Sequence, residues 1–469
     1  MTDAITYGNL LLKLGETPLS VYQLSIVEEA GKHGLMSVSA ETEEGAKEYL
    51  LYEEYGDVAL YADLGQALQP IFYGIVTKME VKARGGRCEV YLEAVTQSYF
   101  MDLTVLNGSY QDIAMTNSQL LIGLLEFYAD SQALIAVPEE ALGQIAVQYQ
   151  ETDWAFLNRM LSHYGTAAYA DSTMPGICLR MGLMDTIVET DWDLLPYTIW
   201  RDTTPKNKEK ELKGQMCYIV EANDIFPLGE KIQFHGQELY IGKINRYLSQ
   251  GILINEYRLY FKEGMEVVRY HNPLLCGVSL YGVVTEVKRN HLRAQLETDV
   301  LLYCDDQYFY PYSTVAASPD GNGWYCMPKI GDQVRVFFPT GDEREGYAVA
   351  NIEGQSAPEA DSPIGNPDLK DIVMPDGKAL KFIDNGIRLC VGKLKGDIAL
   401  TNDGKIQINV KEEQDIKLYS QGKIYFLTEE EGTIEATAGV KIQIINDTGS
   451  KICITDDTVK LEASVIENN

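Results

Sequence analysis

The stretch GVKIQII (439–445), followed closely by GSKICIT (449–455), carries the pattern that decides the fold of this chain. GKIQINV (404–410) and GKIYFLT (422–428) show the same pattern earlier in the sequence. Apolar and polar residues alternate, which places the apolar side chains on one face of a strand. Gly, Asp and Asn between the stretches supply turns. No helix-forming segment follows to cover this face, so it must be buried against other copies of the chain.

The alternation therefore predicts a C-terminal needle of several intertwined chains. Each strand is only about five or six residues long, and a single copy buries too little apolar surface to stand alone. The predicted apolar core of the needle consists of these side chains: Ile406, Ile408, Ile424, Phe426, Ile442, Ile444, Ile452 and Ile454.

Composition indicates an acidic protein of several domains. A chain of 469 residues is too long for one core and suggests about three domains. The 30 tyrosines suit both strands and large protein–protein surfaces. The formal net charge of -30 argues against binding to nucleic acid, because such binding rests on Lys and Arg contacts to phosphate. The charge is explained by solubility, or by a shaft that must not adhere to nucleic acid or membranes.

The sequence shows neither a membrane helix nor a secretory signal. No segment reaches the roughly 18 apolar residues of a membrane helix. Residues 1–14 lack a basic start followed by an apolar run. The eight cysteines form no C-x-x-C pair, so we expect reduced, buried cysteines in a protein made in the cytoplasm.

Two helix signals interrupt otherwise strand-rich sequence. Thr116 and Gln119, before LLIGLLEFY, form a capping-box pattern. Thr152 or Asp153 can cap WAFLNRMLSHY, and Gly165 ends that helix. We therefore expect two capped helices between strand-rich regions.

The region 274–355 has the pattern of a small OB barrel, with five short strands in about 80 residues. Pro328 and Gly331-Asp332 are predicted to form a tight turn that starts the strand QVRVFF. Gly341-Asp342 then returns the chain into GYAVANI as a hairpin. The segment GQSAPEADSPIGNPD (354–368), rich in Pro, Gly and Asp, marks a linker.

Three motifs, in this order, resemble a known family. PIFYGIVTKMEV (70–81) is similar to an early strand of the hub domain of VgrG-type and phage baseplate spike proteins. YQETDWAFLNRMLSHYG (149–165) resembles the helix of that hub, although Met160 stands where Leu is usual. WYCMPKIGD (324–332), together with Gly341-Asp342, resembles the family's OB-fold signature. The order of hub, OB barrel and β-needle covers nearly the whole chain and is more specific than any one motif.

The resemblance implies a mainly β chain with four parts. These are a hub over 1–272 made of two β-barrel-like subdomains with inserted helices, an OB barrel over 273–355, a linker over 356–376 and a trimeric intertwined β-helix over 377–469. The residues that carry the OB motif are Trp324, Pro328, Gly331, Asp332, Gly341 and Asp342.

In function, the resemblance implies the central hub and membrane-puncturing spike of a contractile injection machine. That machine is a phage tail, a tail-like bacteriocin, a type VI apparatus or an extracellular particle. The implied partners are two further copies of the chain, an inner tube protein, baseplate proteins and the target cell envelope. The chain carries no His-x-His motif at its end, so the tip is either blunt or capped by a separate PAAR-like protein. The residues that would dock such a protein are Val465, Ile466, Glu467, Asn468 and Asn469.

We expect no enzymatic activity, cofactor or metal. The sequence lacks nucleotide-binding, nucleophile-elbow and zinc-protease motifs. The five histidines lie far apart in sequence, and we expect His163 to interact with the C-terminal dipole of its helix. DGNG (320–323) lacks the later acidic ligands of a calcium loop and is interpreted as a turn.

The alternative is a β-helical fibre that binds carbohydrate or cleaves cell-wall glycosides. Its catalytic pair would come from the carboxylates at 429–431 and 456–457. Their place in turns between strands favours solvated charges instead. A fibre would also lack the capped helix and the OB turn. An assay of cell-wall hydrolysis by the purified chain distinguishes the two functions.

Overall fold

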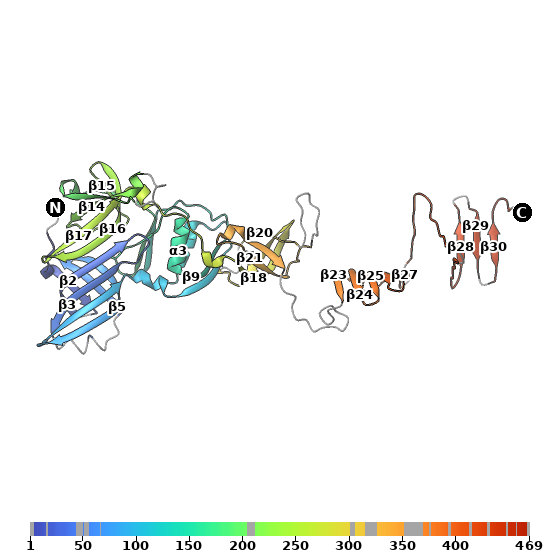
Figure 1. Cartoon of the computed structure of the whole chain (residues 1–469), viewed down its shortest axis with the longest axis horizontal. Coiled ribbons are helices and arrows are strands. Elements are labelled where there is room, and N and C mark those ends of the chain that lie inside the picture. The colour runs from blue at the N-terminus through green and yellow to red at the C-terminus, as the bar shows by residue number, and fades with distance from the viewer. Residues whose placement is uncertain are drawn as a thin grey trace. The chain divides into compact units, whose positions relative to one another are not determined.

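The chain forms two compact units, Met1–Ile352 and Glu353–Asn469. Figure 1 shows the computed structural model, with each element coloured by residue number. The structure describes residues 4–15, 17–43, 50, 56–65, 67–203, 212–300, 305–314, 326–350, 369–374, 377–392, 395–411, 415–428, 432–446, 449–455 and 457–466. Within these residues, no helix has both the length and the apolar character needed to span a membrane.

Six antiparallel strands at the N-terminus close into a barrel. Their order is β1-β4-β5-β6-β3-β2, and β1 also pairs with β2, which completes the circle. Alternate residues of these strands point inward and fill one apolar core, as in Leu10–Leu14 and Leu35–Glu43. The strands are β1 (Leu10–Leu14), β2 (Thr17–Glu29), β3 (Leu35–Glu43), β4 (Asp57–Asp63), β5 (Leu68–Arg84) and β6 (Arg87–Val95).

A second group of strands continues the same twelve-stranded sheet. It begins where β16 pairs with β2, runs on through β17 and β14, and ends at β13. Within this sheet, two four-stranded segments have matching orders, β5-β6-β3-β2 and β16-β17-β14-β13. The strands of this group are β12 (Ile187–Val188), β13 (Tyr197–Arg201), β14 (Met216–Ala222), β15 (Lys231–Phe234), β16 (Gln237–Ser249) and β17 (Ile252–Tyr260).

Two helices lie in the chain between these groups, and both begin as predicted. The Thr116 side chain accepts from the Gln119 amide at 3.2 Å, and the Gln119 side chain accepts from the Thr116 amide at 2.8 Å. Thr152, rather than Asp153, caps the second helix. The elements here are β7 (Val105–Tyr110), α2 (Asn117–Leu125), β8 (Ser131–Ile135), β9 (Ala146–Thr152), α3 (Asp153–Ser162), β10 (Ala168–Ala170) and β11 (Ile177–Met181), with a short α4 (Lys262–Met265) after β17.

Five strands then form the OB barrel. Their order is β20-β19-β18-β21-β22, and a parallel bridge between Tyr312 and Ala348 joins the two ends of the sheet. The barrel core also contains Ile145 and Val147 from the segment that leads into α3, so the two parts share apolar packing. The strands are β18 (Val278–Lys288), β19 (His291–Leu296), β20 (Tyr310–Pro311), β21 (Gln333–Phe338) and β22 (Tyr347–Ala350).

The second unit consists of two small antiparallel sheets. One has the order β23-β24-β25-β26-β27 and the other β28-β29-β30. Their strands are β23 (Lys370–Val373), β24 (Ala379–Ile383), β25 (Gly386–Val391), β26 (Gly396–Thr401), β27 (Ile406–Val410), β28 (Ile442–Ile445), β29 (Lys451–Ile454) and β30 (Val459–Glu462).

The fold class is mainly β, as predicted, but two local expectations are wrong. The structure assigns no strand to 422–428, because a strand needs a partner for its backbone groups and none of the described residues pairs there. Cys276 and Cys326 are exposed rather than buried, although the other described cysteines are buried. Cys304 and most of the predicted linker lie outside the described residues.

Candidate functional site

The sheet β23–β27 carries an apolar face that is exposed in the single chain. Directly paired residues of an antiparallel sheet share a face, so the registers place one row of large apolar side chains across all five strands. A second row runs beside it. The two rows are Ile372, Leu380, Leu389, Ile398 and Ile408, and Phe382, Ile387, Leu400 and Ile406.

The opposite face of this sheet is different in kind. It presents charged and amide side chains such as Lys381, Arg388 and Asp397, with the small residues Ala379, Cys390 and Ala399 buried among them. Arg388 lies 3.5 Å from the Asp397 carboxylate. The sheet is therefore apolar on one face and polar on the other, and only the polar face has local partners.

The sheet β28–β30 repeats the arrangement. Ile442 pairs with Ile454 and Ile444 with Ile452, and the next strand adds Val459 and Leu461 to the same face. Its other face carries the polar residues Gln443, Lys451, Lys460 and Glu462, together with Cys453 and the exposed Ile445. Ile444 is 63% exposed, which is far above what a core isoleucine shows. Large exposed apolar patches of this kind mark interaction surfaces.

The structure brings most of the predicted needle residues onto these faces. Ile406 and Ile408 lie in β27, while Ile442, Ile444, Ile452 and Ile454 lie in β28 and β29. Ile424 and Phe426 are exposed in a stretch without strand pairing. Val465 and Ile466, near the end of the chain, are also exposed. Glu467, Asn468 and Asn469 lie outside the described residues.

A buried arginine joins the hub to the OB barrel. The Arg159 side chain, on α3, is fully buried and donates to the Glu151 carboxylate on β9 at 2.9 Å. It also donates to the Val147 carbonyl oxygen at 2.7 Å and to Glu343, in the turn between β21 and β22, at 2.5 Å. Burial disfavours the Arg159 cation, but Glu343 and Glu151 more than offset this and raise its pKa.

A second joint connects β7 to the barrel. The Asp299 carboxylate accepts from the side chains of Ser109 at 2.5 Å and Gln111 at 2.8 Å, and from the Leu296 amide at 2.8 Å. Burial raises the pKa of Asp299, and these hydrogen bonds partly counter that effect. Tyr310 of the barrel donates to the Gln111 side chain at 2.9 Å.

The OB motif residues lie at two turns of the barrel. The Asp332 side chain accepts from the Lys329 amide at 2.7 Å, and Gly331, with φ +92°, donates to the Val284 carbonyl of β18 at 2.8 Å. Pro328 is half-buried before this turn. Trp324 lies outside the described residues, as does DGNG (320–323).

Gly341 and Asp342 form the second turn. A Cβ on Gly341 would lie 2.5 Å from the Asn272 carbonyl oxygen, so only glycine allows this close approach of the segment between hub and barrel. Asp342 accepts from the Arg344 amide at 3.1 Å and pairs with the Arg344 guanidinium. Hydrogen bonds from Arg344 lower the pKa of Asp342 to about 2.

The expectation for His163 is wrong. His163 lies at the C-terminal end of α3, but burial and the nearby cations Arg269 and Arg159 lower its pKa to about 4. A neutral ring cannot supply the charge that the helix dipole would favour. Nor is the ring isolated, because its centroid is 5.7 Å from that of His271.

One group in the described part of the chain has the donor atoms for a metal ion. His271, Asp342 and Glu343 each offer one ligand atom, and these atoms lie within 4.8 Å of one another. However, Arg344 already neutralises Asp342, and Arg159 already neutralises Glu343. We interpret the group as part of the ion-pair network at the joint.

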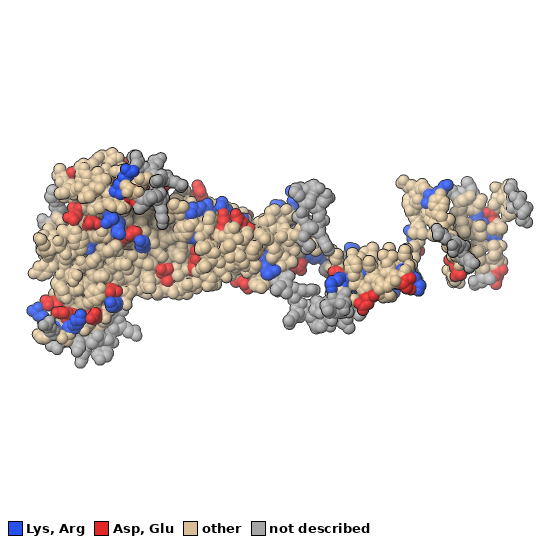
Figure 2. All heavy atoms as spheres, in the orientation of Figure 1, with Lys and Arg blue, Asp and Glu red and all other residues tan. Residues whose placement is uncertain are grey.

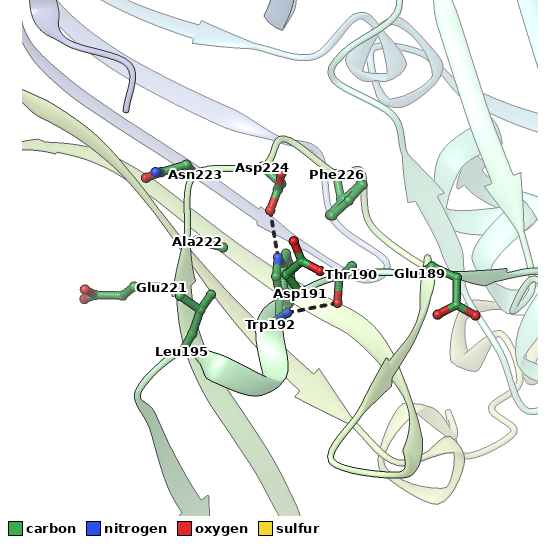
Figure 3. Close-up of a pocket in the computed structure, with 10 residues that line it drawn as sticks. All are labelled: Glu189, Thr190, Asp191, Trp192, Leu195, Glu221, Ala222, Asn223, Asp224 and Phe226. Carbon is green, nitrogen blue, oxygen red and sulfur yellow. Dashed lines mark hydrogen bonds between the residues drawn. The ribbon is translucent and has the colours of Figure 1, made fainter. Parts of the chain in front are cut away.

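A cavity of about 350 Å³ lies beside β14 (Figure 3). Carboxylates of Glu189, Asp191, Glu221 and Asp224 line it, and none of the lining residues that the structure describes is basic. The Trp192 ring nitrogen donates to Asp224 at 2.8 Å, which holds one wall in place. The lining is therefore acidic, with Thr190 contributing a hydroxyl and Leu195 and Phe226 contributing apolar surface.

Charges of both signs are interspersed on the visible face of the first unit (Figure 2).

Sequence reasoning missed the role of Arg159, Glu151 and Glu343, although one signal was available. In the sequence, Arg159 stands between Leu157 and Met160 in a helix with apolar residues around most of its circumference, and an arginine buried in such a helix requires carboxylate partners.

Two family models match the chain. Residues 56–187 match the phage tail baseplate hub (GPD) model, and residues 280–352 match the model of the type VI secretion system/phage-baseplate injector OB domain. No curated protein matches the chain. The boundaries predicted for the four parts stay a prediction.

Solved structures share the fold at low sequence identity. The E. coli c3393 protein, a type VI secretion component described as similar to T4 bacteriophage tail proteins gp27 and gp5, is 14% identical with a TM-score of 0.51, covering 72% of this chain and 98% of that one. The Francisella PdpA–VgrG complex in its lidded form is 8% identical with a TM-score of 0.54, covering 86% of this chain and 80% of that one. The lidless PdpA–VgrG complex is 8% identical with a TM-score of 0.53, covering 88% and 99%.

Proposed function

Because this chain joins a phage tail baseplate hub domain to an injector OB domain in a VgrG-like arrangement, we propose that it is the trimeric central hub and spike of a contractile injection machine. The two family models name phage baseplates and the type VI secretion system, so the proposal covers both kinds of machine. The trimer, the needle and the puncturing of a target envelope are the proposed part. We propose a mechanical function without a catalysed reaction.

The observation that carries the proposal is the apolar face on each C-terminal sheet. Fully burying one Ile or Leu side chain is worth about 1.5–3 kcal/mol, and the faces present many such side chains in unbroken rows. In the single chain, most of the described apolar side chains on these two faces are exposed. Three copies around one axis would bury all the rows together in a dry core, as a needle that resists force requires.

The hub supports the same stoichiometry. Each chain contains two four-stranded segments of one continuous sheet, namely β5-β6-β3-β2 and β16-β17-β14-β13. Three chains would supply six such segments to a ring, which suits docking under an inner tube. We propose that the tube protein and other baseplate proteins bind the hub.

The other end of the chain is proposed to face the target. Exposed Val465 and Ile466 lie beyond the last strand, β30, and offer an apolar seat for a separate PAAR-like tip protein. VgrG of Francisella forms a complex with PdpA, which supports binding of a further protein by a hub of this fold. As part of such a particle, the chain acts outside the producing cell or in the target envelope.

The experiment that tests the proposal is a mass measurement on the purified chain. Mass photometry should find about 158 kDa, three times the 52.5 kDa of one chain. The trimer should persist in mild detergent, because its core is dry and its strands interlock. A population that is mainly monomeric at micromolar concentration would contradict both the needle and the ring.

A further inference from the structure

The first unit contains an open cavity that has no part in the proposed trimer. The cavity has a volume of about 880 Å³ and lies where four segments meet. These segments are the start of β4, the 3-10 helix Gln97–Asp102 with the two residues after it, residues 127–132, and residues 175–177. Binding pockets usually measure about 300–1,000 Å³, so this cavity has room for several side chains of a partner.

Contacts between the segments form the cavity in the free chain. The Gln97 side chain donates to the Asp57 carboxylate at 2.7 Å and accepts from the Gly176 amide at 2.5 Å. A Cβ on Gly176 would lie 2.1 Å from the Asp130 carbonyl oxygen, so only glycine allows the two segments to approach this closely. The walls are therefore in place before a partner binds.

Large apolar side chains on these walls are exposed in the single chain. Phe127 is 73% exposed, Leu103 57% and Phe100 41%. The Tyr128 ring also lines the cavity, and its hydroxyl donates to the Asp153 carboxylate at 2.7 Å, which fixes the ring. Exposed apolar side chains gathered around a concave surface mark a site of interaction.

The charged groups of the cavity are acidic. Asp57 and Asp130 line it, and none of its described lining residues is basic. Asp130 is exposed, so its carboxylate can be reached from solvent. The whole chain carries 69 acidic residues against 39 Lys and Arg. A basic side chain is therefore attracted to the cavity and an acidic one is repelled.

The cavity also adjoins the free edge of a strand. Ser131 and Gln132, at the start of β8, are among its lining residues. β8 is the last strand of the sheet β10-β11-β8, and among the described residues it pairs with β11 alone. Leu134, on the same face of β8 as Gln132, is 57% exposed and extends the apolar surface along the strand. An open edge of this kind accepts an extended peptide as an additional strand.

We propose that the cavity and the β8 edge bind an extended segment of a partner protein, in which a large apolar residue stands next to Arg or Lys. The apolar side chain packs against Phe100, Leu103 and Phe127, and the basic side chain pairs with Asp130. Arg suits this place best, because its guanidinium stacks on aromatic rings and also pairs with carboxylates. The backbone of the segment pairs with β8.

The partner is a basic protein distinct from this chain. The net charge of -30 attracts such a protein over a distance and speeds its association. Salt should weaken the binding, because it screens exposed charges. All walls of the cavity come from one chain, so the inference goes beyond the proposed trimer and does not depend on it.

An mRNA-displayed library of short random peptides tests the proposal on the full chain. Selection on the parent chain should enrich peptides that carry an aromatic or large aliphatic residue next to Arg or Lys. The most enriched peptide is then labelled, and its binding is measured by fluorescence anisotropy at low and high salt.

Two variants of the cavity and two matched controls locate the binding. Phe127→Ser and Asp130→Asn should each weaken binding of the labelled peptide at least about tenfold. Asn tolerates the φ of +53° at position 130, so that variant removes the charge without straining the backbone. Leu194→Ser and Glu297→Gln change exposed residues that do not line the cavity and should leave the affinity unchanged. Thermal unfolding like that of the parent shows that a variant is folded.

Three results would overturn the proposal. One is a selection that enriches no peptide of this composition. Another is a peptide that binds both cavity variants as tightly as the parent, since it then binds elsewhere. The third is a fall in the mass of Phe127→Ser below that of the parent in mass photometry, which would make the cavity an interface between copies. A monomeric parent that binds the peptide through the cavity would contradict the trimer and support this inference.

Discussion

At the scale of single residues, Arg159 is expected to be the side chain on which the joint between hub and barrel depends most. Arg159→Ala would leave Glu343 and Glu151 buried without their cation. Breaking a buried ion pair by removing one partner costs about 3–5 kcal/mol. Thermal and denaturant unfolding of the hub–barrel unit should show a loss of that size.

The matched control for Arg159 is an exposed ion pair. Arg87→Ala removes the contact of Arg87 with Glu41 on the surface, which is worth about 1 kcal/mol or less. If Arg159→Ala changed the free energy of unfolding no more than Arg87→Ala does, the buried network would not hold the joint.

His163 gives this unit a defined pH dependence. Its pKa is about 4 in the folded chain, below the ordinary value of 6.5. Between these values the unfolded chain binds the proton and the folded chain does not, so the free energy of unfolding falls as pH drops from 6.5 to 4. Partial exposure reduces the effect to about 2 kcal/mol. His163→Gln should flatten this part of the stability profile, and an unchanged profile would contradict the burial of a neutral ring.

At the scale of elements, the faces of β28 can be tested against each other. Ile442→Asp would place an unpaired charge in the proposed dry core, at a cost of several kcal/mol in each of three copies. Gln443→Asp, on the opposite face of the same strand, should be nearly neutral. The first variant should lose detergent-resistant trimers while circular dichroism shows the hub still folded. Equal behaviour of the two variants would mean that Ile442 does not face the axis.

The elements also show how far sequence reasoning reached. The alternation at 404–410 and 442–454 could be read because strand periodicity is local, and the caps at Thr116 and Thr152 are local for the same reason. The pairing of β2 with β16 could not be read, since it joins segments more than 200 residues apart. The same holds for Arg159 and Glu343, which are 184 residues apart. Local patterns do not specify such partners.

At the scale of the whole molecule, we predict that the hub end and the tip end act independently. Deleting residues 455–469 removes β30 and the apolar seat at Val465 and Ile466. Binding of a tip partner and killing of target cells should be abolished, while the mass stays that of a trimer. Val465→Asp with Ile466→Asp is the milder variant, because it leaves β30 in place. Particles that kill normally after the deletion would show that the bare needle suffices.

The exposed apolar faces of β23–β30 also determine at which stage of synthesis and assembly the chain is prone to aggregate. The ribosome synthesises the hub first and these strands last. A chain that has not yet associated therefore exposes its rows of apolar side chains to the unpaired strands of other nascent chains. In the proposed trimer, three joined hubs would hold their C-terminal strands at a local concentration of about 1 mM, so these strands would meet one another before they meet another protein. The chain should therefore need chaperones less when several copies are translated from one messenger RNA, because their hubs then meet soon after synthesis. On this view, association of the hubs comes first and promotes correct folding of the spike.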